Sequence, residues 1–338
     1  GTHLSSSTEL EVKWGDLVTK LVPSAQKLRF VNSGTEAVMM AFRMVRAYSG
    51  KTNIIKFHNA FHGWADGPFV AAEGDNNQNG ITKSTRDTIT VLPYDISKVE
   101  DALNKDNIAA VIFQGNQVMD PNFIKQLREL TLNTNTILIF DEVVSGFRWS
   151  NGGMQELYNV IPDVTTMAKI LAGGLPGGCV AGRADIIDTI APNKIRHPGT
   201  FNANPVSAAA GATALEILIN ENICETADKR ALQLKEGLNE LFSKLEINAT
   251  AYGVSSIVHV LFGSDQECDI NYGPNPNLDE NGYSKDIVNL LHRSFINEGL
   301  WGNPISFILS ATHTKDDIEI TLQKYKNVLL NLRDEVAI

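Results

Sequence analysis

The chain has 338 residues, of which 43% are hydrophobic and 20% are charged, values typical of a globular protein long enough for two domains. It carries 29 Lys and Arg against 39 Asp and Glu, a formal net charge of −10. Because nonspecific nucleic-acid binding depends on clustered basic residues, this composition argues against a nucleic-acid partner. The cysteines Cys179, Cys224 and Cys268 are far apart, and they predict neither a disulfide framework nor a metal site.

No apolar run approaches the roughly 20 residues that span a bilayer, so no membrane partner is expected. The first residues, GTHLSSSTELEVKWG, lack the basic and apolar regions of a signal peptide. Together with the sparse cysteines, these features predict a cytoplasmic metabolic enzyme.

Between about residues 25 and 200, short apolar runs alternate with amphipathic stretches, a pattern typical of an α/β fold. The expected strands are Asn53–Phe57, Thr88–Leu92, Ile108–Phe113, Thr136–Phe140 and Val164–Met167. A helix that ends at Gly50 is predicted by the apolar stripe Val38, Ala41, Phe42 and Val45. Another helix is expected from Pro205 to about Asn220.

The C-terminal third is predicted to be a smaller α+β block. Ser256–Phe262 reads as a strand, and Gly273–Gly282 as a surface loop. A helical stripe is formed by Ile287, Leu290, Leu291 and Phe295. Thr314 and Asp317 resemble a capping box that opens a last helix. The expected inward residues of that helix are Ile318, Leu322, Tyr325 and Leu329.

Two segments place polar residues where α/β folds bind ligands, at the carboxyl ends of strands. The first segment is VNSGTEAVMMAFR, residues 31–43, in which a predicted helix follows Ser33, Gly34 and Thr35. The free N–H groups at the start of that helix could bind an anion. The alternative is that these residues only cap the helix. In TILIFDEVVSGFR, residues 136–148, Asp141 ends an apolar run. A carboxylate there can hold a cationic nitrogen protonated, with a metal-binding or structural acid as alternatives.

A third segment, DVTTMAKILAGGLPGG at residues 163–178, places Lys169 after a short β-type run and before a glycine-rich turn. A partly desolvated lysine loses basicity and can form an imine with a carbonyl. The alternative is an ordinary solvated surface lysine, and this segment alone does not distinguish the two. An anion cradle, a strand-end aspartate and a lysine before glycines are together the parts of a pyridoxal 5′-phosphate (PLP) site.

The order and spacing of these parts resemble the class III aminotransferases of fold type I, and most closely their glutamate-1-semialdehyde 2,1-aminomutase branch. The resemblance is carried by THLSSSTELEV, LVPSAQKLRFVNSGTEA, FHNAFHGWAD, FDEVVSGFR, PDVTTMAKILAGGLPGG, HPGTFNANP and SATHTKDDI. It implies a large PLP-binding domain, residues 1–220, whose mostly parallel mixed sheet is flanked by helices and which includes the inter-domain helix. A small C-terminal α+β domain, residues 221–338, would follow.

The resemblance also implies roles for single residues. Lys169 would hold the cofactor covalently and move the substrate α-proton, while Asp141 would pair with the pyridine nitrogen. Ser33, Gly34 and Thr35 would bind the cofactor phosphate. Phe61 and Val143 would contact the two ring faces, and His62 and Gln114 would complete the cofactor site. For His62 a structural role is an equal alternative, and the role of Arg148 stays open.

By the same resemblance, Thr200 would reach the phosphate of the neighbouring subunit, which implies a homodimer with shared active sites. The sequence departs from the family at Gln114-Gly115, where members usually carry Glu-Pro, at Ala168, and in WGNPISFILS. It also begins well past the start of a typical member, so the usual N-terminal segment is expected to be missing.

The resemblance implies an aminotransferase that moves an amino group between two small molecules, an amino acid or amine and a carbonyl compound. The aminomutase, which moves an amino group within one molecule, is the alternative inside the family. A truncated or inactive PLP-binding module is the alternative outside it. A dinucleotide-binding dehydrogenase is set aside, because no G-x-G-x-x-G turn follows an early strand.

Overall fold

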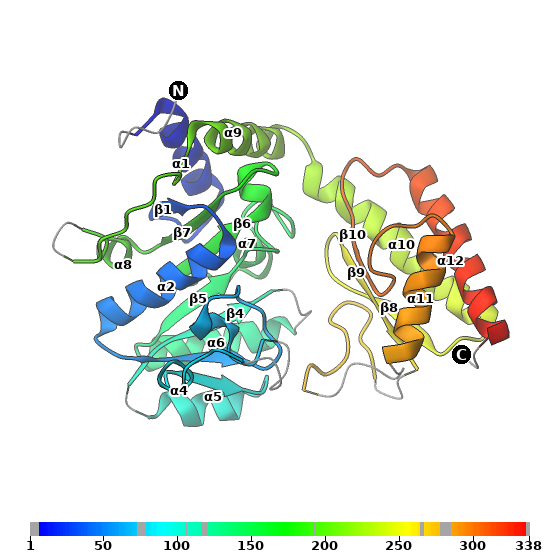
Figure 1. Ribbon diagram of the computed structural model, residues 1–338, viewed down its shortest axis with the longest axis horizontal. Helices are drawn as coiled ribbons and strands as arrows, with labels where there is room; N and C mark the ends of the chain where they lie inside the picture. The colour runs from blue at the N-terminus through cyan, green and yellow to red at the C-terminus, as the bar shows by residue number, and fades with distance from the viewer. Residues whose placement is uncertain are drawn as a thin grey trace. The chain divides into compact units, whose positions relative to one another are not determined.

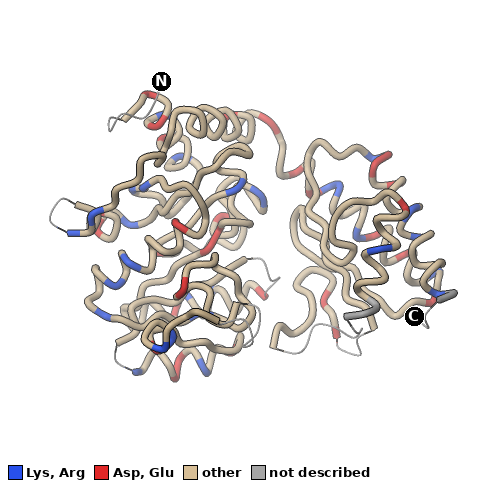
Figure 2. The backbone as a smooth tube through the Cα atoms, in the orientation of Figure 1, with Lys and Arg blue, Asp and Glu red and all other residues tan. Residues whose placement is uncertain are grey.

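The computed structural model describes residues 7–72, 79–105, 107–115, 120–191, 194–263, 267–277 and 285–335. The described chain forms two compact units, the first ending at Glu221 and the second beginning at Asn222 (Figure 1). Each unit has a hydrophobic core of its own. Within these residues, no helix is long and apolar enough to cross a membrane. Basic and acidic residues are interspersed along the chain of both units (Figure 2).

The first unit is built from helices and strands in alternation. Its strands are β1 (Lys27–Val31), β2 (Asn53–Phe57), β3 (Ile89–Leu92), β4 (Ile108–Gln114), β5 (Ile137–Asp141), β6 (Val164–Ala168) and β7 (Gly178–Gly182). Its helices are α1 (Glu9–Leu21), α2 (Gly34–Ser49), α3 (Asp66–Phe69), α4 (Lys83–Arg86), α5 (Ile96–Leu103), α6 (Pro121–Asn133), α7 (Met154–Tyr158), the 3-10 turn η1 (Lys169–Ala172), α8 (Ala184–Ile187) and α9 (Pro205–Asn220).

Within the described residues, these seven strands form one mostly parallel sheet in the order β1-β7-β6-β5-β4-β2-β3. Strands β6, β5, β4, β2 and β3 pair in parallel, and β7 runs antiparallel to both of its neighbours. Parallel strands end at the same edge of a sheet, so the last residues of β4, β5 and β6 lie side by side. Gln114 pairs in register with Asp141, which in turn pairs with Thr166. The α/β fold class expected from the sequence is confirmed.

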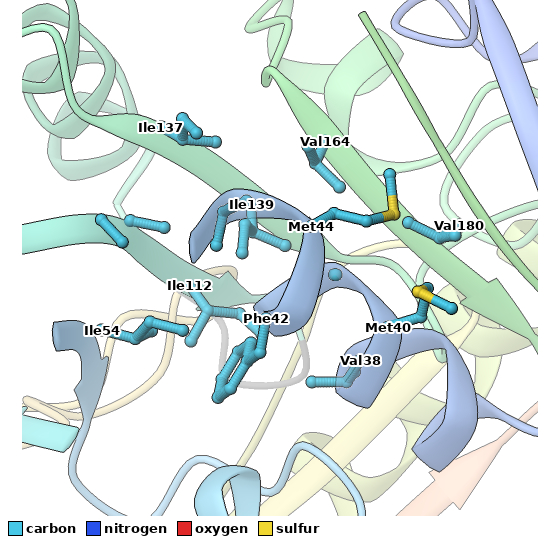
Figure 3. Packing of buried hydrophobic residues seen from close by; sticks show 14 of the residues in the cluster. Val38, Met40, Phe42, Met44, Ile54, Ile112, Ile137, Ile139, Val164 and Val180 are labelled. Atoms are coloured by element: carbon cyan, nitrogen blue, oxygen red, sulfur yellow. The ribbon is translucent and has the colours of Figure 1, made fainter. Parts of the chain in front are cut away.

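Helix α2 packs on the face of the sheet that carries Ile54, Ile112 and Ile139 (Figure 3). Both faces of a parallel sheet are covered, which is why its strands read as continuous apolar runs. The predicted stripe of α2 is confirmed, because all of its members are buried: Val38, Ala41, Phe42 and Val45. The helix ends as expected, since Gly50 adopts a left-handed conformation with φ of 70°.

The predicted strands all appear, with ends within one residue of the expected ones. Helix α9 has the predicted limits. Strands β1 and β7 were not predicted. In β7 the residues GCVAG are small, so their apolar signal is weak, and the strand forms because it fits between β1 and β6.

The second unit combines helices α10 (Ile223–Leu245), α11 (Lys285–Asn297) and α12 (Lys315–Glu335) with strands β8 (Ala249–Tyr252), β9 (Ile257–Phe262) and β10 (Ser306–Ile308). In its described part the strands form an antiparallel sheet in the order β10-β9-β8. Of the loop expected at Gly273–Gly282, residues 278–282 lie outside the described residues, as does the side chain of Ile287.

The predicted capping box at the start of α12 is confirmed. The Asp317 carboxylate accepts hydrogen bonds from the backbone N–H and the hydroxyl of Thr314, at 2.7 and 2.8 Å, and the Asp317 N–H donates back to the Thr314 hydroxyl at 3.1 Å. The inward stripe is confirmed as well, with these residues in the core or packed against it: Ile318, Leu322, Tyr325 and Leu329.

Trp14 of α1 connects this helix to the segment that follows β6 through a buried hydrogen bond. Its ring is fully buried, stacks on Phe30 with centroids 4.0 Å apart, and donates a hydrogen bond from Nε1 to the carbonyl of Leu171 at 3.0 Å. A buried carbonyl that loses its donor keeps its desolvation cost. The indole therefore stabilises the turn η1, whose first residue is Lys169.

We expect Trp14→Phe to lower the free energy of unfolding by about 2 to 3 kcal/mol, because the smaller ring leaves a cavity and the Leu171 carbonyl loses its donor. Urea titration followed by far-ultraviolet circular dichroism measures the change. The matched control is Trp301→Phe, which changes a side chain that is 92% exposed and should shift stability by less than about 0.5 kcal/mol. Equal effects of the two substitutions would contradict the role of Trp14.

Candidate active site

A cavity of about 320 Å³ lies in the first unit, at the edge of the sheet where β4, β5 and β6 end. Its walls include nine of the residues expected to bind the cofactor: Ser33, Gly34, Thr35, Phe61, His62, Gln114, Asp141, Val143 and Lys169. Thr200 is exposed, and neither it nor Arg148 belongs to the lining found among the described residues. The fold therefore collects in one place residues that are spread over 137 positions, from 33 to 169.

Asp141 is the buried acid of this cavity, with 3% of its surface exposed. Its Oδ2 lies 2.7 Å from Nδ1 of His62. Its Oδ1 accepts hydrogen bonds from the Val143 N–H at 3.1 Å and from the Thr166 hydroxyl at 3.2 Å. A carboxylate offers about four acceptor positions. The three donors among the described residues thus leave one position for a donor in the cavity.

His62 is completely buried, and burial lowers the pKa of its imidazole although Asp141 opposes the shift. A neutral ring that faces a carboxylate through Nδ1 carries its proton there and donates it to Asp141. Its Nε2 is then an acceptor, and no partner for it is found among the described residues. His62 therefore supports Asp141 through the Nδ1–Oδ2 hydrogen bond.

Lys169 begins the turn η1 directly after β6 and has a left-handed backbone, with φ of 51°. Its side chain keeps contact with solvent, yet the cavity walls remove enough water to lower the pKa of its amino group, while Asp141 opposes this shift. A lowered pKa raises the fraction of neutral amine, which is the nucleophilic form. Non-glycine residues with positive φ are uncommon and concentrate at functional sites.

The start of α2 lies on the cavity wall and offers hydrogen-bond donors that an anion could accept. Ser33 is the N-cap, and its hydroxyl accepts from the Glu36 N–H at 3.2 Å. The N–H groups of Gly34 and Thr35 precede the first intrahelical bond and carry the positive end of the helix dipole. A methyl group on Gly34 would approach the Val143 side chain within 2.9 Å. Glycine is needed there because the helix start lies directly against Val143.

Phe61, His62 and Gly63 form a segment after β2 that closes the cavity from another side. Gly63 has φ of 90°, and an added Cβ would lie 2.6 Å from the Thr35 hydroxyl. The segment is therefore packed against the start of α2. Phe61 is 46% exposed and contacts Phe69 edge to face. Its ring remains available to a flat ligand.

Glu142 follows Asp141 in the sequence, but its side chain forms hydrogen bonds with the segment that follows it, between Ser145 and Gln155. Its buried carboxylate accepts from the Ser145 hydroxyl at 2.8 Å, from the Met154 N–H at 2.6 Å, and from the backbone and side chain of Gln155 at 3.1 and 3.0 Å. Burial raises the pKa of Glu142, and these hydrogen bonds oppose the shift. The acid fixes the loop that carries Val143.

These residues fit PLP. The cavity offers an amine for the cofactor carbonyl, a carboxylate with an open acceptor position for a protonated ring nitrogen, and helix N–H groups for a phosphate. Gln114 is 8% exposed, and its Oε1 has no hydrogen-bond partner among the described residues. A buried polar atom without a partner is costly, so a ligand that donates to it would be stabilised.

The sequence interpretation missed several contributors to the site. Thr166 holds Asp141, and Asn32 and the segment Leu175–Gly177 line the cavity. A signal for Thr166 existed, because a hydroxyl residue in a fully buried strand needs a partner. No pattern in the sequence indicates which loop residues reach the cavity.

The sheet and the site together define a PLP-dependent enzyme of fold type I. The sequence pattern of the class-III aminotransferases matches residues 2–329, and the chain belongs to this family. Enzymes of the family use PLP, so the expected cofactor is confirmed at the level of the family. The aminotransferase and the aminomutase interpretations are both consistent with this membership.

Two kinds of relatives stand out. The chain is 37% identical to a glutamate-1-semialdehyde 2,1-aminomutase of Sulfolobus acidocaldarius, over 98% of this chain and 82% of that protein. It is 36% identical to the enzyme of the same name from Chlorobaculum parvum, over 98% of this chain and 79% of that protein. Among solved structures, an omega-transaminase from Sphaerobacter thermophilus has a TM-score of 0.89 at 30% identity, over 98% of this chain and 80% of the other.

Proposed function

We propose that this chain transfers amino groups with PLP held by Lys169 and Asp141. The single observation that supports this most is the placement of an amine of lowered pKa and a buried carboxylate on the walls of one cavity. PLP supplies the electron sink for chemistry at the carbon that bears the amino group. The protein supplies the placement of the reacting groups and the proton transfers.

Each wall of the cavity has a distinct task in this proposal. Lys169 would hold the cofactor through its carbonyl, and the lowered pKa of its amino group would suit it to carry a proton to and from the substrate carbon. Asp141 would accept a hydrogen bond from a protonated ring nitrogen, at the acceptor position that His62, Val143 and Thr166 leave open. Ser33, Gly34 and Thr35 bind the phosphate through hydroxyl and N–H groups.

Three side chains orient the ring. Phe61 and Val143 line the cavity and would contact the two faces of the ring. Gln114 would accept a hydrogen bond from a polar substituent of the ring, as its Oε1 lacks a partner among the described residues. Because Gln114 is neutral, it adds no charge to the ring environment.

The reaction we propose is transamination between two small molecules, an amino donor and a carbonyl acceptor. An aminomutase must retain its half-converted substrate in a closed polar site, since loss of that molecule stops the cycle. Lys169 is the only cationic side chain among the described residues that line the cavity. The residues Gln114-Gly115 and WGNPISF also depart from the aminomutase pattern. These features favour exchange of two substrates.

The aminomutase is the second candidate, and the names of the relatives favour it. Both relatives described above, at 36% and 37% identity, carry the name glutamate-1-semialdehyde 2,1-aminomutase. The cofactor cradle does not distinguish the two reactions, because both require the same cofactor, held by the same residues.

We also propose that two copies of the chain form a homodimer with shared sites. The first unit exposes large apolar side chains, among them Trp64 at 78% and Phe201 at 69%. Large aromatic side chains are enriched at protein–protein interfaces, so their exposure supports the proposal. Thr200 is exposed beside Phe201, where it could enter a site of the partner.

Borohydride reduction tests the attachment to Lys169. The purified protein should be yellow, and reduction should place the pyridoxyl mass on the peptide that contains Lys169. Lys169→Ala should remove the label and leave the fold intact. Asp141→Asn should keep the label but slow the half-reaction with an amine by about 100-fold or more, because an amide cannot hold the ring proton. A label on another lysine would exclude the assignment.

The choice of reaction is tested with glutamate-1-semialdehyde and with a panel of amines. We expect the amines to convert the enzyme to its amino form and a carbonyl acceptor to restore it. With glutamate-1-semialdehyde alone, 5-aminolevulinate should not accumulate beyond about one equivalent per site. Sustained turnover without added donor or acceptor would establish the aminomutase, and bound PLP without any half-reaction would indicate a binding module.

The shared site is tested with mixed dimers of Thr200→Ala and Lys169→Ala chains. If Thr200 serves the partner, one site of each mixed dimer keeps both residues, and about half of the wild-type activity per dimer should return. Each parent dimer lacks one of the two residues in every site and provides the control. Absence of recovery, or a fully active monomer in sedimentation, would refute sharing.

A further inference from the structure

Lys56 is a lysine in the interior of the sheet. It lies in β2, between Ile55 and Phe57, and none of its surface is exposed. Burying an amino group is costly unless hydrogen bonds compensate for the lost water. Burial lowers its pKa to about 7, and the carboxylate of Asp141 opposes this shift. Such a residue needs a structural or functional reason.

The amino group of Lys56 is held by two backbone carbonyls. Nζ donates to the carbonyl of Pro68 at 2.7 Å and to that of Val70 at 2.6 Å. Pro68 lies in the short helix α3, and Val70 follows its last residue. Lys56 therefore ties the end of α3 to the sheet, and the chain between the two attachment points contains Phe61, His62 and Gly63.

The same side chain lies within electrostatic range of the active-site acid. The charge of Lys56 contributes to lowering the pKa of His62, and the charge of Asp141 contributes to raising the pKa of Lys56. Residues two apart on a strand point to the same face of the sheet, so Lys56 lies on the face of Ile54, and Asp141 on the face of Ile139. Ile54 and Ile139 both lie on the face that α2 covers. The tether thus acts on the side of the sheet where the site is built.

We propose that Lys56 is a positioning residue for the reaction, because it anchors the segment that presses the His62 imidazole against Asp141. This inference rests on the proposed function. Without the tether, the carbonyls of Pro68 and Val70 lose their donor in a buried place, and the segment from His58 to Val70 gains freedom. Asp141 would then lose its shortest hydrogen bond in part of the population.

A purely structural lysine is the competing explanation, and the chain contains a matched example. Lys235 in α10 of the second unit is also buried, and its Nζ donates to the carbonyls of Gly253 at 3.1 Å and Ile270 at 3.2 Å. It belongs to neither the cavity nor the segment around His62. Loss of either lysine should lower stability, but only loss of Lys56 should change the cofactor site.

The experiment compares Lys56→Met with Lys235→Met in two measurements. Titration of the apoprotein with PLP gives the dissociation constant, which should rise at least about tenfold for Lys56→Met and less than about twofold for Lys235→Met. Hydrogen exchange of the apoprotein should become faster in residues 58–70 for Lys56→Met alone. This second measurement needs no cofactor.

A double variant separates positioning from general damage. If Lys56 acts through the imidazole, Lys56→Met combined with His62→Ala should bind PLP no more weakly than His62→Ala alone, within about threefold. If the two substitutions instead raised the dissociation constant of PLP by independent factors that multiply in the double variant, the proposal would be overturned. So would wild-type affinity and exchange in a folded Lys56→Met protein.

Lys56→Gln replaces Lys56→Met if the latter does not fold, since the amide can still donate to one of the carbonyls without a charge. We expect a smaller rise of the dissociation constant, together with faster exchange in residues 58–70. Unchanged values would overturn the proposal. A wild-type protein that binds no PLP would refute the proposed function instead, while hydrogen exchange would still decide whether the tether exists.

Discussion

The hydrogen bond between His62 and the buried carboxylate of Asp141 is the interaction around which the first unit is arranged. A charge out of contact with water is tolerated only when donors surround it. The end of β5, the hydroxyl of Thr166 on β6 and the loop after β2 each supply one part of that environment. The constraint explains why the segment around His62 is packed so closely on the start of α2, where Gly63 leaves no room for a side chain.

Much of this fold could be predicted from the sequence, because a parallel sheet covered on both faces produces apolar runs that end in polar residues. Asp141 and Lys169 were found in this way. Strand β7 was missed, since its small residues pack only in the context of β1 and β6. The place of Lys56 was equally hidden, because its compensating partners are backbone carbonyls that have no signature in the sequence.

The two candidate reactions differ in how long a molecule must stay in the site, and not in how the cofactor is held. The residues proposed to hold the cofactor come from the first unit and suit either reaction. Specificity must therefore arise from walls that contact the substrate. Family membership identifies the cofactor chemistry, whereas the identity of the substrate depends on the side chains that the substrate contacts.

The left-handed backbone of Lys169 has a consequence for the evolution of this protein. A glycine at that position would adopt φ of 51° without strain, and so would give a more stable chain than lysine does. Selection for thermal resistance alone would thus tend to remove the residue that we propose holds the cofactor. Libraries screened for heat tolerance without a functional screen should accumulate substitutions at this position, so that the most durable variants would be inert.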